Sequence, residues 1–227
     1  MSDAHASALQ HHFESLEQQK ESSTLGMWVF IAQEVLFFGG LFLTYTVYRV
    51  KYPLVFAAAS HHLNVTLGAA NTAVLICSSL TMALAVHAAA LGRRKQIAMW
   101  LLLTVLLGGV FLGVKYVEYH EKLAPCFGDG PHAGCLAPGA RFDAETIHLE
   151  GNEGREAQIY YSLYFAMTGL HALHMIIGFP ILLGLAARAW KGRYGPEWST
   201  PVELTGLYWH FVDIVWIFLF PFLYLIH

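Results

Sequence analysis

The chain has 227 residues, of which 56% are hydrophobic, and its mean hydropathy is +0.47. Only 13% of the residues are charged, whereas soluble domains carry about 25%. The net charge of −3 shows no basic excess, which argues against nucleic-acid binding. The composition therefore excludes an ordinary soluble domain and predicts a chain that crosses a membrane several times.

Residues 1–24 form a polar N-terminal segment that we expect on the cytoplasmic side. No basic stretch precedes the first apolar run, so the segment does not have the pattern of a signal peptide. A short helix and a disordered tail both fit its composition. Residues 25–227 are predicted to form one membrane domain.

Five apolar runs follow in order, at about residues 25–50, 64–91, 97–122, 157–189 and 201–226. Each exceeds the roughly 20 residues that a helix needs to cross a bilayer. The alternation typical of barrel strands is absent, and backbone groups in lipid must pair within their own segment. We therefore expect an all-α fold, a polytopic membrane helix bundle with five transmembrane helices. Pro180 predicts a kink in the fourth helix, and Pro201 suits the start of the fifth.

The two short loops after the second and fourth runs are basic, which predicts the orientation of the chain. By the positive-inside rule these loops lie in the cytoplasm, so the N-terminus is cytoplasmic and the C-terminus periplasmic. The segment at about 123–156 is then a periplasmic loop. The basic residues are Arg93, Arg94 and Lys95 in the first of these loops and Arg188, Lys191 and Arg193 around the second.

The predicted periplasmic loop carries two closely spaced cysteines, Cys126 and Cys135. A cysteine pair on the oxidising side of a membrane predicts a disulfide, although two free thiols remain the alternative. The loop is also acidic. It is either a solvated loop or a contact surface for a neighbouring subunit or a basic cytochrome c.

Ionisable and polar groups inside the runs are the candidate functional residues. A charge in the middle of a bilayer costs at least about 2.5–3.5 kcal/mol, so such a group must face protein, water or a bound polar group. We expect Glu34 to be buried against polar atoms, with His210 or a lipid headgroup as a candidate neighbour. The predicted buried polar or proton-uptake residues are Glu34, Glu118, His171, His174, His210 and Asp213. No catalytic residue is predicted.

His171 and His174 lie one helical turn apart and share a face of the fourth predicted helix. They are either metal or haem ligands or interior histidines that hydrogen-bond to neighbouring helices. The second interpretation is favoured, because the runs hold too few histidines and carboxylates for a di-iron site and no clear axial pair for a haem. We extend it to His210 and predict no metal site.

Small residues recur at four-residue spacing in two of the predicted helices. Gly109 and Gly113 lie in the third, and Ala69 and Ala73 in the second. Such steps allow helices to approach closely in membranes, although chance spacing is the simpler explanation. Tryptophans that we expect near the membrane interfaces are Trp28, Trp100, Trp190 and Trp198.

Four segments in fixed order carry a family resemblance. Residues 33–42 read Gln-Glu-Val-Leu-Phe-Phe-Gly-Gly-Leu-Phe, and Glu118 is followed by Tyr119. Residues 171–178 read His-Ala-Leu-His-Met-Ile-Ile-Gly, and residues 208–216 read Tyr-Trp-His-Phe-Val-Asp-Ile-Val-Trp. The chain resembles cytochrome c oxidase subunit III in these motifs, in its five-span form. It departs from the common seven-span form in lacking two initial helices and in its longer, cysteine-bearing loop.

The resemblance implies an accessory subunit of an aerobic respiratory haem–copper terminal oxidase, which reduces O₂ to water and pumps protons. Haem and copper would lie in the partner catalytic subunit, subunit I, with subunit II beside it, and none in this chain. Cytochrome c or a respiratory supercomplex are further partner candidates. The location implied is the bacterial inner membrane.

The resemblance also implies bound phospholipid that helps to sustain proton uptake by the catalytic subunit. Basic side chains on the cytoplasmic side could neutralise lipid phosphates. The predicted lipid-binding residues are Arg93, Arg94, Arg188 and Trp28.

The sequence leaves three alternatives open. Two share the fold, namely subunit III of a quinol oxidase and the related protein that accompanies nitric oxide reductases. The third is a free-standing proton-coupled transporter that uses Glu34 as its proton site. A transporter would be expected to show an internal repeat or a broken helix, and neither is visible in the sequence.

Overall fold

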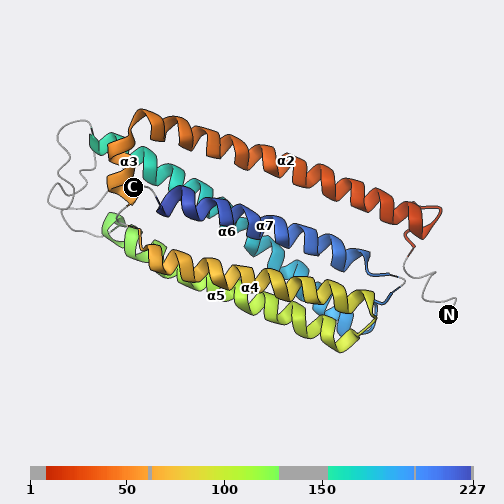
Figure 1. Cartoon of the computed structure of the whole chain (residues 1–227). Helices are drawn as coiled ribbons and strands as arrows, with labels where there is room; N and C mark the ends of the chain where they lie inside the picture. Colours follow the sequence, from red (N-terminus) through yellow and green to blue (C-terminus); the bar gives the residue numbers. More distant parts are fainter. Residues whose placement is uncertain (1–8, 61–62, 128–152, 197, 226–227) are drawn as a thin grey trace. The chain divides into compact units, whose positions relative to one another are not determined.

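The computed structural model describes residues 9–60, 63–127, 153–196 and 198–225, apart from the side chains of residues 58, 121–127 and 153–157. These residues form helices, with no strand among them beyond an isolated bridge between Gly195 and Trp198. The predicted all-α fold is confirmed. The helices are α2 (Leu16–Lys51), α3 (Pro53–Ser60), α4 (Val65–Ala90), α5 (Arg94–Phe127), α6 (Glu153–Trp190) and α7 (Thr200–Tyr224) (Figure 1).

Five of these helices are long and apolar enough to span a membrane, as predicted. They are α2, α4, the Arg94–His120 part of α5, the Gln158–Trp190 part of α6, and α7. Most predicted boundaries agree with the structure to within a few residues. Helix α3 was not predicted, and the first helix begins nine residues earlier than predicted, at 16 rather than 25.

The start of α2 lies in the polar segment because side chains there cap the helix. The backbone N–H of Gln18 donates to the Ser15 hydroxyl over 3.1 Å, and the backbone N–H of Glu14 donates to Gln18 Oε1 over 2.9 Å. This reciprocal capping satisfies donors that a helix start leaves without partners. Of the two alternatives for residues 1–24, a helix is therefore correct for residues 16–24.

The ends of α4 and α6 are built alike, by glycines in the left-handed conformation. Gly92 has φ 67° and Gly192 has φ 75°. The following backbone N–H groups, of Arg93 and Arg193, donate back to the carbonyls of residues 88 and 188 over 3.0 and 3.1 Å. This arrangement is the Schellman motif, which glycine favours because it has no Cβ. It closes the helices just before the two basic loops.

Prolines take the positions expected of them only in part. Pro201 lies in the first turn of α7, as predicted. Pro180 lies inside α6, which continues to Trp190, so this proline does not end the helix. Whether it kinks the helix stays a prediction.

The described chain divides into two compact units. Unit 1 comprises the described residues up to Phe37, with Ile76–Leu107 and Met175–Ile214. Unit 2 comprises Phe38–Leu75, the described residues of 108–174, and those from Val215 onward. Each of α2, α4, α5, α6 and α7 contributes residues to both units.

The core of unit 1 is built around α7. Trp209 is fully buried, and its ring lies 6.0 Å from that of Phe179 of α6. Gly178 lets the two helices approach, since a Cβ there would come within 2.9 Å of the Trp209 ring. At Gly206 of α7, a Cβ would come within 2.9 Å of Val86 of α4.

The core of unit 2 is an aromatic cluster. Tyr45 of α2, Phe56 of α3 and Tyr160 of α6 are fully buried, and their ring centroids lie 5.3–6.3 Å apart. The Tyr45 hydroxyl donates to the carbonyl of Phe222 over 2.7 Å, and the Tyr160 hydroxyl to that of Leu223 over 2.8 Å. Buried hydroxyls thus satisfy carbonyls near the end of α7.

Of the two explanations for the small-residue steps at Gly109, Gly113, Ala69 and Ala73, chance spacing is the one that fits the structure. A Cβ at either glycine would meet nothing within 4 Å, and both alanines are exposed. These faces of α4 and α5 point away from the neighbouring helices. The spacing in the sequence cannot show which way a small-residue face points.

Candidate functional site

The first candidate residue, Glu34, lies in unit 1 with 9% of its surface exposed. Tyr208 of α7 lies close enough for electrostatic interaction with Glu34. The centroid of the Tyr208 ring also lies 5.9 Å from that of Phe30. The expected burial of Glu34 is confirmed. The polar neighbour identified beside it is Tyr208, a residue that the sequence analysis had not singled out.

Three side chains from α4 and α7 come together elsewhere in unit 1. Ser79 Oγ lies 2.7 Å from Nδ1 of His210, which confirms the predicted hydrogen bond between helices for this histidine. Ser79 also lies close to the carboxyl of Asp213, which is only 2% exposed. Neither carboxyl oxygen of Asp213, however, has a protein hydrogen bond of regular geometry.

Hydroxyl groups extend this polar region toward α5. The Trp209 indole N–H donates to Ser78 Oγ over 3.0 Å, and the Ser78 hydroxyl donates to the Thr104 carbonyl over 3.4 Å. The hydroxyls of Thr81 and Thr104 lie 2.8 Å apart. These residues were not predicted as part of a site. Their only signal was that Ser78 and Thr81 are three residues apart on α4.

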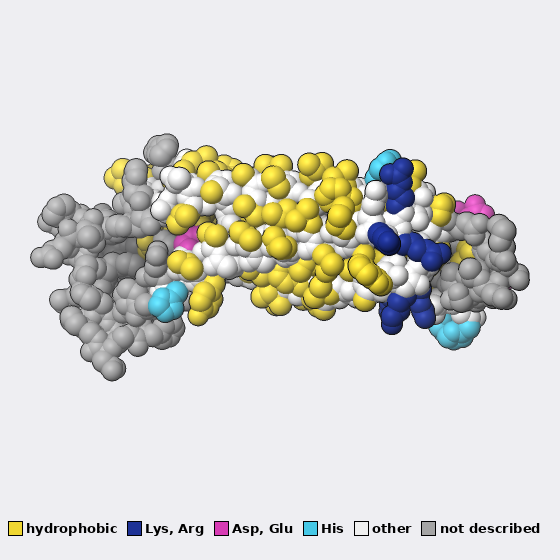
Figure 2. Space-filling model, turned by 90° about the horizontal axis from the view of Figure 1, so that it is seen from below, with side chains coloured by type: hydrophobic (Ala, Val, Ile, Leu, Met, Phe, Trp, Pro, Cys, Tyr) yellow, Lys and Arg dark blue, Asp and Glu magenta, His cyan; other side chains and the backbone are white. Residues whose placement is uncertain are grey.

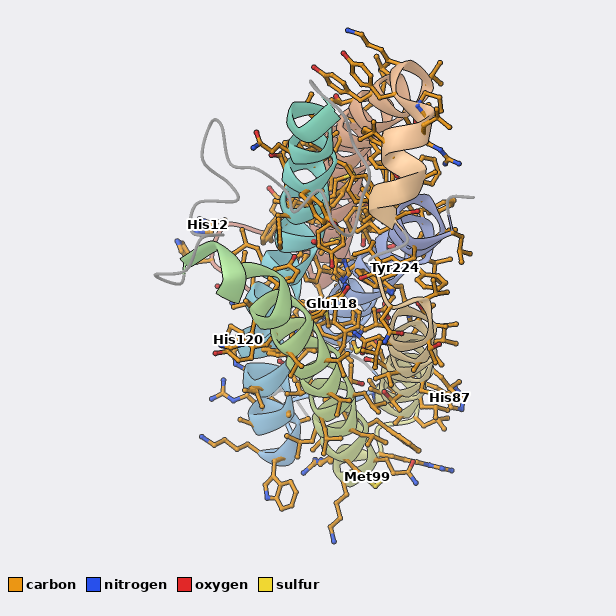
Figure 3. The ribbon with its side chains drawn as sticks, turned by 90° about the vertical axis from the view of Figure 1, so that its left-hand side faces the viewer. His12, His87, Met99, Glu118, His120 and Tyr224 are labelled. Atoms are coloured by element: carbon orange, nitrogen blue, oxygen red, sulfur yellow. The ribbon has the colours of Figure 1, made fainter. Side chains whose placement is uncertain are left out.

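A buried ion pair forms the centre of the polar cluster in unit 2. Lys115 Nζ lies 2.8 Å from Glu118 Oε2, one turn along α5. The Tyr164 hydroxyl of α6 donates to Glu118 Oε1 over 2.9 Å, and the Tyr224 hydroxyl of α7 donates to the same oxygen. Figure 3 shows Glu118 and Tyr224 next to each other. Three helices are thus joined through one carboxylate.

Aromatic rings complete the surroundings of Lys115. Its Nζ lies 4.5 Å from the centroid of the Trp216 ring and 5.0 Å from that of Tyr224, within the range of cation–π attraction. It also donates to the Tyr224 hydroxyl. The burial predicted for Glu118 is confirmed. The tyrosines that surround the ion pair and the tryptophan beside Lys115 were not predicted.

His171 does not make the hydrogen bonds that we predicted. It is 1% exposed, and neither ring nitrogen has a protein partner. Its ring packs at 5.4 Å from Phe111 and 5.3 Å from Trp216, so its neighbours offer ring faces and edges rather than acceptors. His174 Nδ1 pairs with the Leu170 carbonyl of its own helix over 2.9 Å, so its bond to another helix stays a prediction.

Among the residues that the structure describes, no three His, Cys, Asp or Glu side chains lie close enough to hold a metal ion. The buried carboxylates instead lie beside serine, tyrosine and lysine. The cluster around Asp213 in unit 1 and the cluster around Glu118 in unit 2 can join helices. Both can also hold polar groups or protons inside the bundle.

The predicted lipid-binding residues are exposed in unit 1. Arg93, Arg94 and Arg188 flank the two loops closed by the left-handed glycines. The Arg94 guanidinium packs against Gly192, which joins one loop to the other. Figure 2 shows Lys and Arg side chains gathered next to a surface of mostly hydrophobic side chains. Trp28, on α2, is 56% exposed.

Cys126 and Cys135 lie outside the described side chains, so the disulfide stays a prediction. The same holds for most of the acidic loop at about 123–156. Cys77, the cysteine of α4, is a free and exposed thiol.

Comparison with known proteins agrees with these findings. The family model described as "Cytochrome c oxidase subunit III" matches residues 5–136 and 155–227. "Cytochrome c oxidase subunit 3" of Corynebacterium diphtheriae is 32% identical over 89% of this chain and 87% of its own length, and that of Loxodonta africana is 34% identical over 90% and 70%. "Quinol oxidase subunit 3" of Bacillus spizizenii is 28% identical over 92% and 91%. The chain therefore belongs to the cytochrome c oxidase subunit III family.

Proposed function

We propose that this protein is an accessory integral-membrane subunit of an aerobic haem–copper terminal oxidase that reduces O₂ to water and pumps protons. The observation that carries the proposal is the family match, which extends over all five membrane-spanning helices. In this role the chain stabilises the catalytic subunit and is not itself catalytic. Haem and copper belong to the partner catalytic subunit.

The buried ionisable groups contact other side chains of this chain, which supports a non-catalytic role. Glu118 is held by Lys115 and two tyrosine hydroxyls, and His210 pairs with Ser79. These contacts join helices to each other. Buried charges arranged in this way set the packing of a bundle, which suits a subunit that supports its neighbour.

Orientation follows from the basic loops. The loops that follow α4 and α6 both belong to unit 1 and carry exposed arginines and lysines. We place them in the cytoplasm by the positive-inside rule, with the C-terminus in the periplasm of a bacterial inner membrane. The buried polar groups of unit 1 would then lie toward the cytoplasmic side, the side from which protons are taken up.

Anionic phospholipid is the ligand proposed for the basic loops. Exposed Arg93 and Arg188 lie in the same unit as the exposed apolar side chains of Trp28 and Val29. A lipid needs both a cation for its phosphate and an apolar surface for its chains. Arg94 has a second role, since its guanidinium already packs against Gly192.

The lipid proposal is tested by changing Arg93 and Arg188 to Gln together. We expect the gently solubilised protein to retain less anionic phospholipid in native mass spectrometry. Arg49→Gln, in unit 2, is the control and should leave lipid retention unchanged. Equal retention by all three proteins would remove this site.

The relatives are named either as cytochrome c oxidase or as quinol oxidase subunits, which gives two candidate electron donors. We propose cytochrome c as the donor, in keeping with the family name and with the relative from Corynebacterium diphtheriae. A quinol is the second candidate, favoured by the relatives named "Quinol oxidase subunit 3" from two Bacillus strains and "Cytochrome bo(3) ubiquinol oxidase subunit 3" from Pseudomonas aeruginosa.

Capture of the affinity-tagged chain from its native membranes tests the function. The captured complex should contain the catalytic subunit and should consume O₂ when reduced cytochrome c is supplied. Consumption with a quinol only would select the second candidate. A chain that is captured without any O₂-reducing partner would contradict both.

A further inference from the structure

The Asp213 carboxyl is the buried polar group in unit 1 whose environment is least complete. Its side chain is 2% exposed, and neither oxygen has a protein hydrogen bond of regular geometry. A carboxylate offers about four acceptor sites. Buried polar groups in native proteins almost always have partners, either in the protein or in ordered water. Ordered water would supply the partners that regular protein hydrogen bonds do not give this carboxyl.

The groups around Asp213 show what that partner can be. The Ser79 hydroxyl of α4 lies close to the carboxyl, and the same Oγ lies 2.7 Å from His210 Nδ1. The Ser79 hydroxyl has one hydrogen and two possible acceptors, the ring nitrogen and the carboxyl side. If His210 carries its proton on Nδ1, the ring donates to Ser79 Oγ, and the serine hydrogen is free to point toward Asp213.

We propose that Asp213, Ser79 and His210 form an internal water-binding site between α4 and α7. In this arrangement His210 Nδ1–H donates to Ser79 Oγ, and the Ser79 hydroxyl donates to a bound water. The water in turn donates to the Asp213 carboxyl. The water has at least two polar partners in the protein, which is the usual requirement for an ordered buried water.

A metal cation fits this site less well than water. Hard cations need several oxygen ligands, whereas this site offers one carboxyl group and one hydroxyl. The imidazole beside the hydroxyl is a nitrogen ligand, which does not suit alkali or alkaline-earth ions. Water needs no charge balance and can both donate to the carboxyl and accept from the serine.

The site does not rest on the proposed oxidase role, so it can be tested on the full-length protein with whichever subunits it retains. A structure at a resolution that shows ordered water should reveal a water within about 3 Å of both Ser79 Oγ and an Asp213 oxygen. Labelled His210 should give the nitrogen NMR signals of the Nδ1–H tautomer.

Three variants sharpen the test. Asp213→Asn should keep the water, and Asp213→Leu should lose it and lower the midpoint of thermal unfolding. Glu203→Gln is the control, because Glu203 lies on the same helix and has its own partner in Ser199. It should leave the water in place.

Several outcomes would overturn the proposal. They are a dry Asp213 site in the wild-type protein, a density whose occupancy follows the Na⁺ or K⁺ concentration, the Nε2–H tautomer of His210, and an Asp213→Leu protein more stable than wild type. If the leucine variant does not fold, the wild-type and Asp213→Asn structures decide the question alone.

Discussion

At the scale of single residues, Lys115 and Glu118 are the pair whose contacts are most complete. Each charge is buried, and each has tyrosine partners besides the other. A buried charge that loses its partner destabilises a protein strongly, because the remaining charge keeps its desolvation cost. The pair should therefore show strong coupling when it is mutated.

Lys115→Met should destabilise the protein by about 3–5 kcal/mol, since it leaves Glu118 without its cation. Unfolding of the purified chain in mixed detergent micelles measures the change. Lys95→Met is the matched control, because Lys95 lies on the same helix and is exposed. The double variant Lys115→Met with Glu118→Gln should regain part of the loss. Equal stability of the Lys115 and Lys95 variants would contradict the assignment.

Residues such as Glu34, Glu118 and Asp213 could be predicted as buried from the sequence alone. An ionisable group in a long apolar run is costly in lipid, so its position implies a protein or polar environment. Its partners could not be predicted, because they lie on other helices. Tyr208 is identified as a neighbour of Glu34, and Ser79 as a neighbour of Asp213, only once the rotation of α2, α4 and α7 about their axes is known.

At the scale of helices, α6 and α7 pack closely where Gly178 faces Trp209. The tryptophan ring is fully buried and cannot move away from an added side chain. Overpacking of this kind usually costs about 1–3 kcal/mol. Gly184, on the same helix, has nothing within 4 Å of its Cβ position.

Gly178→Ala should be less stable than Gly184→Ala by about 1–3 kcal/mol. Both changes raise helix propensity by a similar amount, so the difference reports the contact with Trp209. The two unfolding curves, recorded in the same detergent, measure it. If the two variants unfolded together, Gly178 would not be the point of close approach.

The first turn of α2 is capped by side chains of the polar segment. Ser15→Ala removes the acceptor of the Gln18 N–H and should cost about 0.5–2 kcal/mol locally. Amide hydrogen exchange at residues 16–20 should become faster. Ser22→Ala, an exposed position inside the same helix, should not change it. Unchanged exchange in the Ser15 variant would show that the cap does not hold this end of the helix.

The existence of five spanning helices was predictable because hydrophobic length alone determines it. The starts and ends of the helices were less predictable. Helix α2 begins in polar sequence because Ser15 caps it. Helix α3 is too short to give a periodic signal. The small-residue steps in the sequence do not mark helix contacts. Gly109 and Gly113 have the right spacing but face away from the other helices, whereas Gly178 and Gly206 lie at contacts.

At the scale of the whole molecule, α2 differs from the other spanning helices. Only 6% of its most apolar window is buried within the chain, against 56% for α7. A helix with so little cover presents apolar side chains to lipid or to another subunit. This distribution suits a protein that works beside a partner in the membrane, and it agrees with the family to which the chain belongs.

The location of the redox centres is the most direct test of an accessory role. The complex captured through this chain is separated into its subunits in a stronger detergent, and haem and copper are measured in each fraction. We predict that both stay with the catalytic partner and that the fraction holding this chain contains neither in stoichiometric amount. Haem or copper bound one-to-one to this chain would contradict its assignment as a non-catalytic subunit.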